Sequence, residues 1–306
     1  MLTNNQKALI QYVVKNDLKT ARTYAKFILE SNKTKADEVF CNHQLAILKE
    51  QETKGIEIPM NLQGILQTEC SAYPFIKERY FLSNREREAL EHIQRMNMVA
   101  SRLEEEFKIH YCNSMLLCGQ SGTGKTTFAR YVASELQLPF FYLNMTQVMS
   151  SLLGKTGQNL DLVFHFVGSV PCVFVIDEID VIGIARTNDN SRMDGEMNRV
   201  LVSIMQNLDM LPNKTIVIAA SNRPEAIDKA LNRRFTKRHD VQALSADEAQ
   251  TFVQHYIQAI GLQHLIGNWV FENNQNYTPA YLTTLIHERM AECILDDYDK
   301  GGISHA

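Results

Sequence analysis

The alternation of apolar and polar residues divides the chain into short strands and longer helices. Nearly uninterrupted apolar runs predict buried parallel strands at 114–118, 139–144, 172–177 and 215–222. Between these runs, apolar residues recur every three or four positions, as on one face of a helix. A further strand is expected at 238–244. Strands that alternate with helices in this way are typical of an α/β fold built on a parallel sheet.

Several helices begin at capping motifs that the sequence shows directly. Ser83-Asn-Arg-Glu86 and Ser245-Ala-Asp-Glu248 are capping boxes, in which the Ser and Glu side chains bond each other's backbone N–H groups. Thr278 before Pro279 is an N-cap with proline at the first helical position; this last helix is expected to end near Leu295, with 296–306 frayed. Other helices are expected at 125–138, 146–153, 158–167 and 196–208, with a polar loop at 187–195.

The pattern changes in the first part of the chain. Residues 1–50 predict two or three short helices, either as a small antiparallel unit or as an irregular extension packed on the next domain. Gly and Pro interrupt 49–80, which predicts a linker lying along that domain. The expected organisation is an N-terminal helical region with its linker at 1–82, a large α/β domain at 83–244 and a small helical domain at 245–306.

Composition narrows the class of protein. The chain has 306 residues, 45% of them hydrophobic and 22% charged, with a formal net charge of −4. This balance gives no overall attraction to nucleic acid or to anionic membranes. No apolar run is long enough for a transmembrane helix, and the N-terminus has no apolar signal core. The six cysteines are scattered without a C-x-x-C pair, so a cytoplasmic protein is expected.

One loop carries the clearest chemistry. Gly119-Gln-Ser-Gly-Thr-Gly-Lys-Thr126 fits G-x-x-x-x-G-K-[ST], the loop whose backbone N–H groups cradle nucleotide phosphates. It lies between a predicted strand and a predicted helix, so the phosphates would meet the positive end of that helix. Lys125 is expected to reach the β- and γ-phosphates of ATP, and the Thr126 hydroxyl to bind Mg²⁺. The expected nucleotide-binding residues are Gly119, Gln120, Ser121, Gly122, Thr123, Gly124, Lys125, Thr126, Thr127 and Asp177.

Two later strands end in polar residues. Cys172-Val-Phe-Val-Ile-Asp-Glu-Ile-Asp180 places carboxylates at the carboxyl end of a buried strand, where open α/β sheets bind ligands. Asp177 is expected to hold Mg²⁺, directly or through water, and Glu178 to polarise the attacking water. Asn222, at the end of the next strand, either orients this water or simply forms the turn before Arg223.

Taken together, the motifs resemble the AAA family of AAA+ ATPases. The phosphate loop, Ile-Asp-Glu-Ile-Asp, Ala-Ala-Ser-Asn-Arg-Pro and Ala-Leu-Asn-Arg-Arg-Phe follow one another in that family's order, over roughly residues 83–306. The resemblance implies a P-loop NTPase fold, with a parallel sheet sandwiched by helices and a C-terminal helical lid. It also implies a ring, usually a homohexamer, with nucleotide between subunits.

The resemblance assigns further roles. Asn222 matches the family's sensor-1 position, while Arg233 and Arg234 match its arginine fingers; on local sequence alone these two arginines would be a solvated surface pair. Ala280 stands where many wider AAA+ proteins carry an arginine. The absence of this arginine is typical of the AAA family proper. Leu152 takes the position of the pore-loop aromatic found in protein-threading members, or is ordinary packing at a helix end.

These features predict a ring-forming ATPase that uses ATP and Mg²⁺ to remodel, unfold or disassemble a protein substrate drawn through a central pore. The N-terminal helices resemble the adaptor domains of spastin- and katanin-like members, which implies an adaptor or effector partner there. The alternative is an ATPase acting on nucleic-acid-bound complexes, such as a loader or a mobile-element regulator. A third class is a nucleotide-gated scaffold that turns over slowly.

Overall fold

The computed structural model describes residues 3–14, 18–31, 41–42, 44–45, 56, 58–69, 74–151, 156–184, 193–262, 269–272 and 275–299. The chain divides into two compact units, Met1–Glu57 and Ile58–Ala306. The domain boundaries expected after residues 82 and 244 stay predictions.

The first unit contains two of the expected helices. α1 (Asn4–Val14) and α2 (Leu18–Ser31) pack against each other, and the rings of Tyr12 and Tyr24 stack with their centroids 5.5 Å apart. Three apolar side chains of α1 are nevertheless exposed, because Ile10, Val13 and Val14 keep 50%, 53% and 79% of their surface open. Two helices alone offer little facing surface to cover such side chains. The apolar positions expected in a third helix, Val39, Phe40, Ala46 and Ile47, lie outside the described residues.

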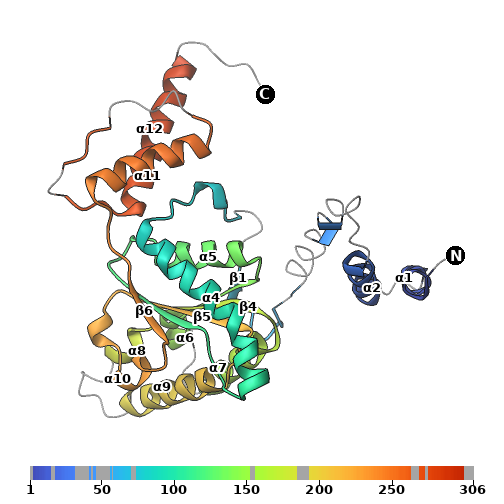
Figure 1. Ribbon diagram of the computed structural model, residues 1–306. Coiled ribbons are helices and arrows are strands. Elements are labelled where there is room, and N and C mark those ends of the chain that lie inside the picture. The colour runs from blue at the N-terminus through green and yellow to red at the C-terminus, as the bar shows by residue number, and fades with distance from the viewer. Residues whose placement is uncertain are drawn as a thin grey trace. The chain divides into compact units, whose positions relative to one another are not determined.

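The second unit is built on one six-stranded sheet (Figure 1). The strands are β1 (Leu66–Thr68), β2 (Ser114–Cys118), β3 (Phe140–Asn144), β4 (Cys172–Asp177), β5 (Thr215–Ser221) and β6 (Lys237–Asp240), and their order in the sheet is β1-β3-β4-β5-β2-β6. Neighbouring strands are parallel except β1 and β3. The predicted parallel α/β sheet is therefore confirmed.

Helices cover both faces of this sheet. The elements around it are η1 (Lys77–Arg79), α4 (Asn84–Phe107), α5 (Lys125–Leu136), α6 (Met145–Ser151), α7 (Thr156–Ser169), α8 (Val181–Ile184), α9 (Met193–Met210), η3 (Pro224–Ala226) and α10 (Lys229–Asn232). Side chains of β4 alternate between the faces. Val173 and Val175 join α4 and α5 in one core, whereas Phe174 meets Phe164 of α7 edge to face, at 5.3 Å between centroids. Burial on both faces explains why the central strands are apolar along most of their length.

The C-terminal helices form a core of their own. α11 (Ala246–Ala259) and α12 (Pro279–Asp299) bury Val253, Ile257, Leu282 and Ile286 against each other. Both expected capping motifs are present. Ser245 and Glu248 form a complete capping box, and the Thr278 hydroxyl accepts a hydrogen bond from the Tyr281 N–H at 3.3 Å. Figure 1 shows these two helices apart from the sheet.

The linker expected at 49–80 contains a strand. β1 pairs antiparallel with β3, with Leu66 opposite Leu143 and Thr68 opposite Phe141, and Leu66 is only 1% exposed. Three residues are too few to show a period-two pattern. Only the edge of β3, which comes more than seventy residues later, makes this segment a strand.

The strand expected at 238–244 is shorter than predicted. β6 ends at Asp240. The Val241 N–H makes one more bond, to the carbonyl of Cys118 at 2.7 Å, and the chain then turns toward α11. Leu244 instead forms an isolated bridge with Tyr277 in the lid. Val241 is therefore buried in the core between the sheet and helices α4 and α5, whereas Leu244 is buried in the core of the C-terminal helices.

Helices α7, α9 and α12 are longer than predicted. α12 continues to Asp299, so the prediction that residues 296–299 are frayed is wrong. Residues 300–306 lie outside the described residues. α9 begins at Met193, inside the loop expected at 187–195. Neither end carries a strong stop or start signal, and pattern alone places such ends only within a few residues.

In the described part of the chain, no helix has both the length and the apolarity to cross a bilayer.

Candidate functional site

The parallel sheet brings three loops together at one edge. β4, β5 and β2 are neighbours, with Ile176 opposite Ala219 and Cys118 opposite Ser221. Because the strands are parallel, the segments that follow them leave the sheet side by side. The glycine-rich loop, the Asp177–Asp180 segment and the Asn222 turn therefore meet.

Glycine is required in the loop for two different reasons. A Cβ on Gly119 would lie 2.1 Å from the carbonyl oxygen of Val241, so a side chain at this position would collide with backbone. Gly124 has φ +95°, in the left-handed region that favours glycine, and directly precedes α5. The loop thus runs close to the end of β6 and turns sharply into the helix. Its N–H groups lie at the positive end of α5.

Lys125 is buried and fully bonded. Its ammonium donates to the carbonyls of Gly119 and Gln120, both at 2.8 Å, and to Asn222 Oδ1 at 2.7 Å. The residue is only 7% exposed. Burial lowers the pKa of Lys125, and the negative charges of Asp177 and Asp180 oppose this shift. The charge is thus held at the base of the loop, next to two carboxylates.

Thr126 and Asp177 form a pair suited to a magnesium ion. The Thr126 hydroxyl donates to Asp177 Oδ2 at 2.8 Å, and the Tyr142 hydroxyl donates to the same oxygen at 3.1 Å. Mg²⁺ typically takes one or two protein oxygens and completes its shell with phosphates and water. In the described part of the chain, no cluster of three or more His, Cys, Asp or Glu residues offers a cage for a metal ion. These two oxygens therefore fit Mg²⁺ held jointly with a phosphate.

Glu178 has a strained backbone. Its φ is +56°, the left-handed region, although it is neither glycine nor asparagine, and such a conformation costs about 1–2 kcal/mol. Two bonds support it: the Glu178 N–H donates to Asp177 Oδ1 at 2.9 Å, and the Ile179 N–H donates to the Ala220 carbonyl at 3.1 Å. Strain of this kind concentrates at functional sites.

Asn222 connects two of these groups. Its Oδ1 accepts from Lys125, and its backbone N–H donates to Asp180 Oδ1 at 3.3 Å. Asp180 is buried, at 6% exposure. Neither Asp180 nor Tyr142 was assigned a role from the sequence. Asp180 ends the acidic motif and could have been noticed there, whereas nothing in the strand pattern singles out Tyr142.

A cavity of about 650 Å³ opens beside these residues. One end is lined by the loop, Asp177, Glu178 and Asn222. The other end is aromatic, with Phe75, Tyr80 and Phe81 from the segment before α4 and with Phe252 and Tyr256 from α11. The sequence placed the 74–80 stretch in a linker and did not predict this wall. The cavity suits a ligand with an anionic end and a flat, largely apolar end.

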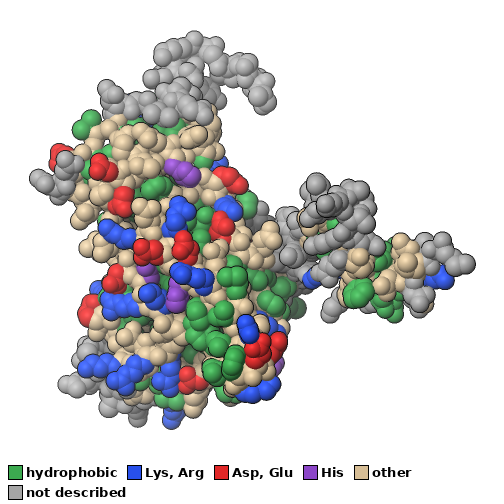
Figure 2. Space-filling model, viewed as in Figure 1, with side chains coloured by type: hydrophobic (Ala, Val, Ile, Leu, Met, Phe, Trp, Pro, Cys, Tyr) green, Lys and Arg blue, Asp and Glu red, His purple; other side chains and the backbone are tan. Residues whose placement is uncertain are grey.

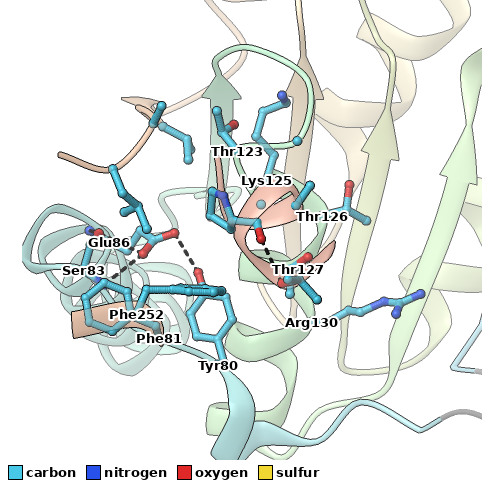
Figure 3. A pocket seen from close by; sticks show the side chains of 18 of the residues that line it. Tyr80, Phe81, Ser83, Glu86, Thr123, Lys125, Thr126, Thr127, Arg130 and Phe252 are labelled. Atoms are coloured by element: carbon cyan, nitrogen blue, oxygen red, sulfur yellow. Dashed lines mark hydrogen bonds between the residues drawn. The ribbon is translucent and has the colours of Figure 1, made fainter. Parts of the chain in front are cut away.

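Figure 3 shows Glu86 on the aromatic side of this cavity. Its carboxylate accepts from the Tyr80 hydroxyl at 2.7 Å and from the Ser83 hydroxyl at 2.8 Å. Burial raises the pKa of Glu86, and these hydrogen bonds oppose the shift. The capping box predicted at Ser83–Glu86 is therefore present and also forms part of the wall.

The two predicted arginines lie elsewhere. Arg233 and Arg234 follow α10, and neither is among the described residues that line the cavity. The Arg234 Nε donates to both oxygens of Asp209, at 2.9 and 3.1 Å, whereas Arg233 is exposed. A single chain thus brings together Lys125, Thr126, Asp177, Glu178 and Asn222 but not the arginines. Leu152 lies outside the described residues.

Comparisons with known proteins match part of the chain to one family. Residues 115–243 match the family described as "ATPase family associated with various cellular activities (AAA)". The chain is 40% identical over 123 residues to the uncharacterized AAA family ATPase y4kL of Sinorhizobium fredii, covering 40% of this chain and 37% of that protein.

Two further relatives have names that refer to proteolysis. The ATP-dependent zinc metalloprotease FtsH 3 of Conexibacter woesei is 39% identical over 136 residues, 42% of this chain and 18% of that protein. A putative 26S proteasome regulatory subunit homolog of Methanothermobacter thermautotrophicus is 27% identical over 153 residues, 49% of this chain and 41% of that protein. The chain spans less than half the length of each of these three relatives.

Proposed function

From the AAA-family ATPase domain that residues 115–243 form, we propose that this protein hydrolyses ATP and uses the reaction to remodel or unfold a protein substrate. One observation carries the proposal. Lys125, the Thr126–Asp177 pair, Glu178 and Asn222 meet at the carboxyl edge of the sheet, beside a cavity with an anion-binding end and an aromatic end. A nucleoside triphosphate has the matching shape and charge.

Binding follows from the groups around the cavity. The phosphates lie on the loop's N–H groups at the start of α5, and Lys125 exchanges its carbonyl partners for the β- and γ-phosphates. The nucleobase lies against the aromatic wall of Phe75, Tyr80 and Phe252. The lid contributes directly, because the Ala280 N–H bonds the Gly122 carbonyl at 3.2 Å. Nucleotide binding is thereby coupled to the position of α12.

Hydrolysis needs one group to take a proton and others to hold charge. Glu178 accepts a proton from a water whose oxygen bonds to the γ-phosphorus, while the bond from that phosphorus to the β–γ bridging oxygen breaks. The products are ADP and inorganic phosphate. Asn222 orients the water and the γ-phosphate. Thr126 and Asp177 would hold Mg²⁺, which neutralises charge on the phosphate oxygens.

The active site is completed by a second copy in a ring, of which a homohexamer is the expected form. Arg233 is exposed and lies outside the cavity of its own subunit, so its guanidinium is available to a neighbour's γ-phosphate. Such arginines contribute about 10³–10⁵ in rate in related phosphoryl-transfer systems. Arg234 is held by Asp209 at 35% side-chain exposure, which suits it to fixing the segment or to changing partners on assembly.

Mixing two inactive variants tests the shared site. Arg233→Ala should lower ATP turnover far more than ATP binding, because the lost charge acts in the transition state. An Arg233→Ala chain mixed with a Lys125→Ala chain should recover part of the activity, since some interfaces pair an intact pocket with an intact arginine. Turnover per subunit should also rise with protein concentration. Full activity of a dilute monomer, with no recovery in the mixture, would contradict the shared site.

Arg234→Ala needs a control, because it also breaks the ion pair with Asp209. Asp209→Ala breaks the same pair and leaves the guanidinium in place. An exposed pair of this kind stabilises a fold by about 0.2–1 kcal/mol. Loss of turnover in Arg234→Ala but not in Asp209→Ala would assign the arginine to phosphate chemistry; equal losses would assign it to structure.

Two relatives support a protein substrate, since their names refer to a metalloprotease and to a proteasome regulatory subunit. The substrate would pass the pore loop at Leu152, and the helices α1 and α2 would receive an adaptor or effector. A second candidate is action on nucleic-acid-bound complexes. Lys229, Lys237 and Arg238 are exposed, and in Figure 2 basic side chains gather where Figure 1 places α10 and β6.

Stimulation of ATP turnover separates the two candidates. We expect a permanently unfolded protein to raise the rate of phosphate release, because a threading ATPase is limited by its engagement with substrate. Single- or double-stranded DNA should leave the rate unchanged. The measurement is phosphate release at saturating ATP with each addition. Stimulation by DNA alone would favour the nucleic-acid function instead.

A further inference from the structure

The three residues after β4 form a strap that crosses the end of β5. Glu178, with its φ of +56°, turns the chain out of line with β4. The Ile179 N–H then bonds the Ala220 carbonyl at 3.1 Å, and Asp180 Oδ1 accepts from the Asn222 N–H at 3.3 Å. The strap is thus bonded to Ala220 in β5 and to Asn222 directly after β5. It carries Asp180 from the β4 side toward the glycine-rich loop.

Asp180 is unusual for its burial. Only 6% of its surface is exposed, and a buried carboxylate is costly unless hydrogen bonds or opposite charge compensate it. Among the described residues, no Lys, Arg or His comes within ion-pair distance of it. The compensation comes from the Asn222 N–H and, at longer range, from the buried ammonium of Lys125, whose pKa Asp180 raises. Both compensating groups belong to the site.

Two different groups hold Asn222, one at its backbone and one at its side chain. Its backbone is held by Asp180, and its side-chain oxygen is held by Lys125. Lys125 has two further acceptors in the loop, Gly119 O and Gln120 O, so its position does not depend on Asn222 alone. Asn222 is itself exposed, so packing holds it only weakly. Its orientation depends on these bonds.

We propose that Asp180 is a positioning residue for ATP hydrolysis: its buried carboxylate holds the Asn222 backbone, so that the Asn222 carboxamide faces the Lys125 ammonium and the γ-phosphate. The inference rests on the proposed ATPase function. Without Asp180, nucleotide still binds, because the loop and Lys125 keep their own contacts. Asn222 then points at the γ-phosphate only part of the time, and the chemical step slows. A displacement of about 1 Å near a reacting group costs up to about a hundredfold in rate.

Four variants test the proposal: Asp180→Ala, Asp180→Asn, Asn222→Ala and the double variant Asp180→Ala/Asn222→Ala. Asp180→Ala should lower kcat about tenfold or more with the nucleotide Kd little changed. Asp180→Asn should recover much of kcat, because its amide oxygen can still accept from the Asn222 N–H. The double variant should be no slower than Asn222→Ala, since residues that act through one another are not additive. Fully additive losses, or an effect on Kd alone, would overturn the proposal.

Asp161→Ala is the matched control. Asp161 accepts from the Ser203 hydroxyl at 2.9 Å and from the Asn207 amide at 2.7 Å, so it too is a bonded carboxylate in the same unit. It lies on the surface between α7 and α9, away from the cavity. Its removal should leave kcat unchanged. An equal loss of kcat in Asp161→Ala would show that Asp180→Ala acts through general stability, and would overturn the proposal.

Hydrogen exchange gives a readout that does not depend on turnover. In the nucleotide-free protein, a peptide spanning Asn222 should exchange one amide faster in Asp180→Ala and at the wild-type rate in Asp180→Asn. Unchanged exchange in Asp180→Ala overturns the positioning contact, even if the wild type is an active ATPase. A wild type without ATPase activity would refute the proposed function instead, and the exchange experiment would still decide whether Asp180 holds Asn222.

Discussion

Replacing Lys125 by alanine is expected to weaken nucleotide binding severely. The ammonium is 7% exposed and held at the base of the loop by three acceptors, so it already lies beside the phosphate position. Removing one partner of a buried, hydrogen-bonded charge pair costs about 2–5 kcal/mol. At 1.4 kcal/mol per factor of ten, the Kd should rise at least about thirtyfold.

A fluorescent-nucleotide titration measures this effect. Lys214→Ala is the matched control, because Lys214 also donates to a main-chain carbonyl, that of Ser169 at 2.8 Å, but does not line the cavity. It should bind nucleotide like the wild type. Melting temperatures of both variants show whether they are folded. An unchanged Kd in a folded Lys125→Ala variant would contradict the assignment of the phosphate loop.

The second large effect is expected from Glu178→Gln, which should bind ATP and fail to hydrolyse it. Glutamine keeps the size of the side chain and the bond from its own backbone N–H to Asp177, but it cannot accept the proton from water. Loss of a general base typically lowers a rate by about 10²–10⁴. The left-handed backbone at this position is equally unfavourable for Glu and Gln, so stability should be unchanged.

Single-turnover hydrolysis of bound ATP, with size measurements in parallel, checks this prediction. ATP should persist on the variant, and rings or larger assemblies should accumulate. Glu225→Gln offers a control, because Glu225 is an exposed residue of η3 that does not line the cavity; it should turn over normally. If Glu178→Gln hydrolyses ATP at the wild-type rate, another group is the base.

The comparison of sequence with structure shows where local patterns suffice. Residues 172–176 of β4 and 216–220 of β5 are all apolar because helices cover both faces of the sheet, and this pattern is visible without coordinates. β1 is different, because it is a strand only through its pairing with β3. The aromatic wall around Tyr80 and Phe81 was equally hidden, since it forms only where Phe252 of α11 meets Phe81, with ring centroids 6.0 Å apart.

The sequence by itself determined the groups within each of two continuous segments: the phosphate loop with the start of α5, and the carboxylates Asp177 and Glu178 at the end of β4. Their spacing along the chain already sets their chemistry, because backbone geometry alone places neighbours in a strand, loop and helix. Contacts between distant segments were decided only by the tertiary structure. Lys125 and Asn222 are 97 positions apart, and Asp180 and Asn222 are 42 apart. No local pattern records such partners, because the order of the strands in the sheet, rather than in the chain, brings their ends together.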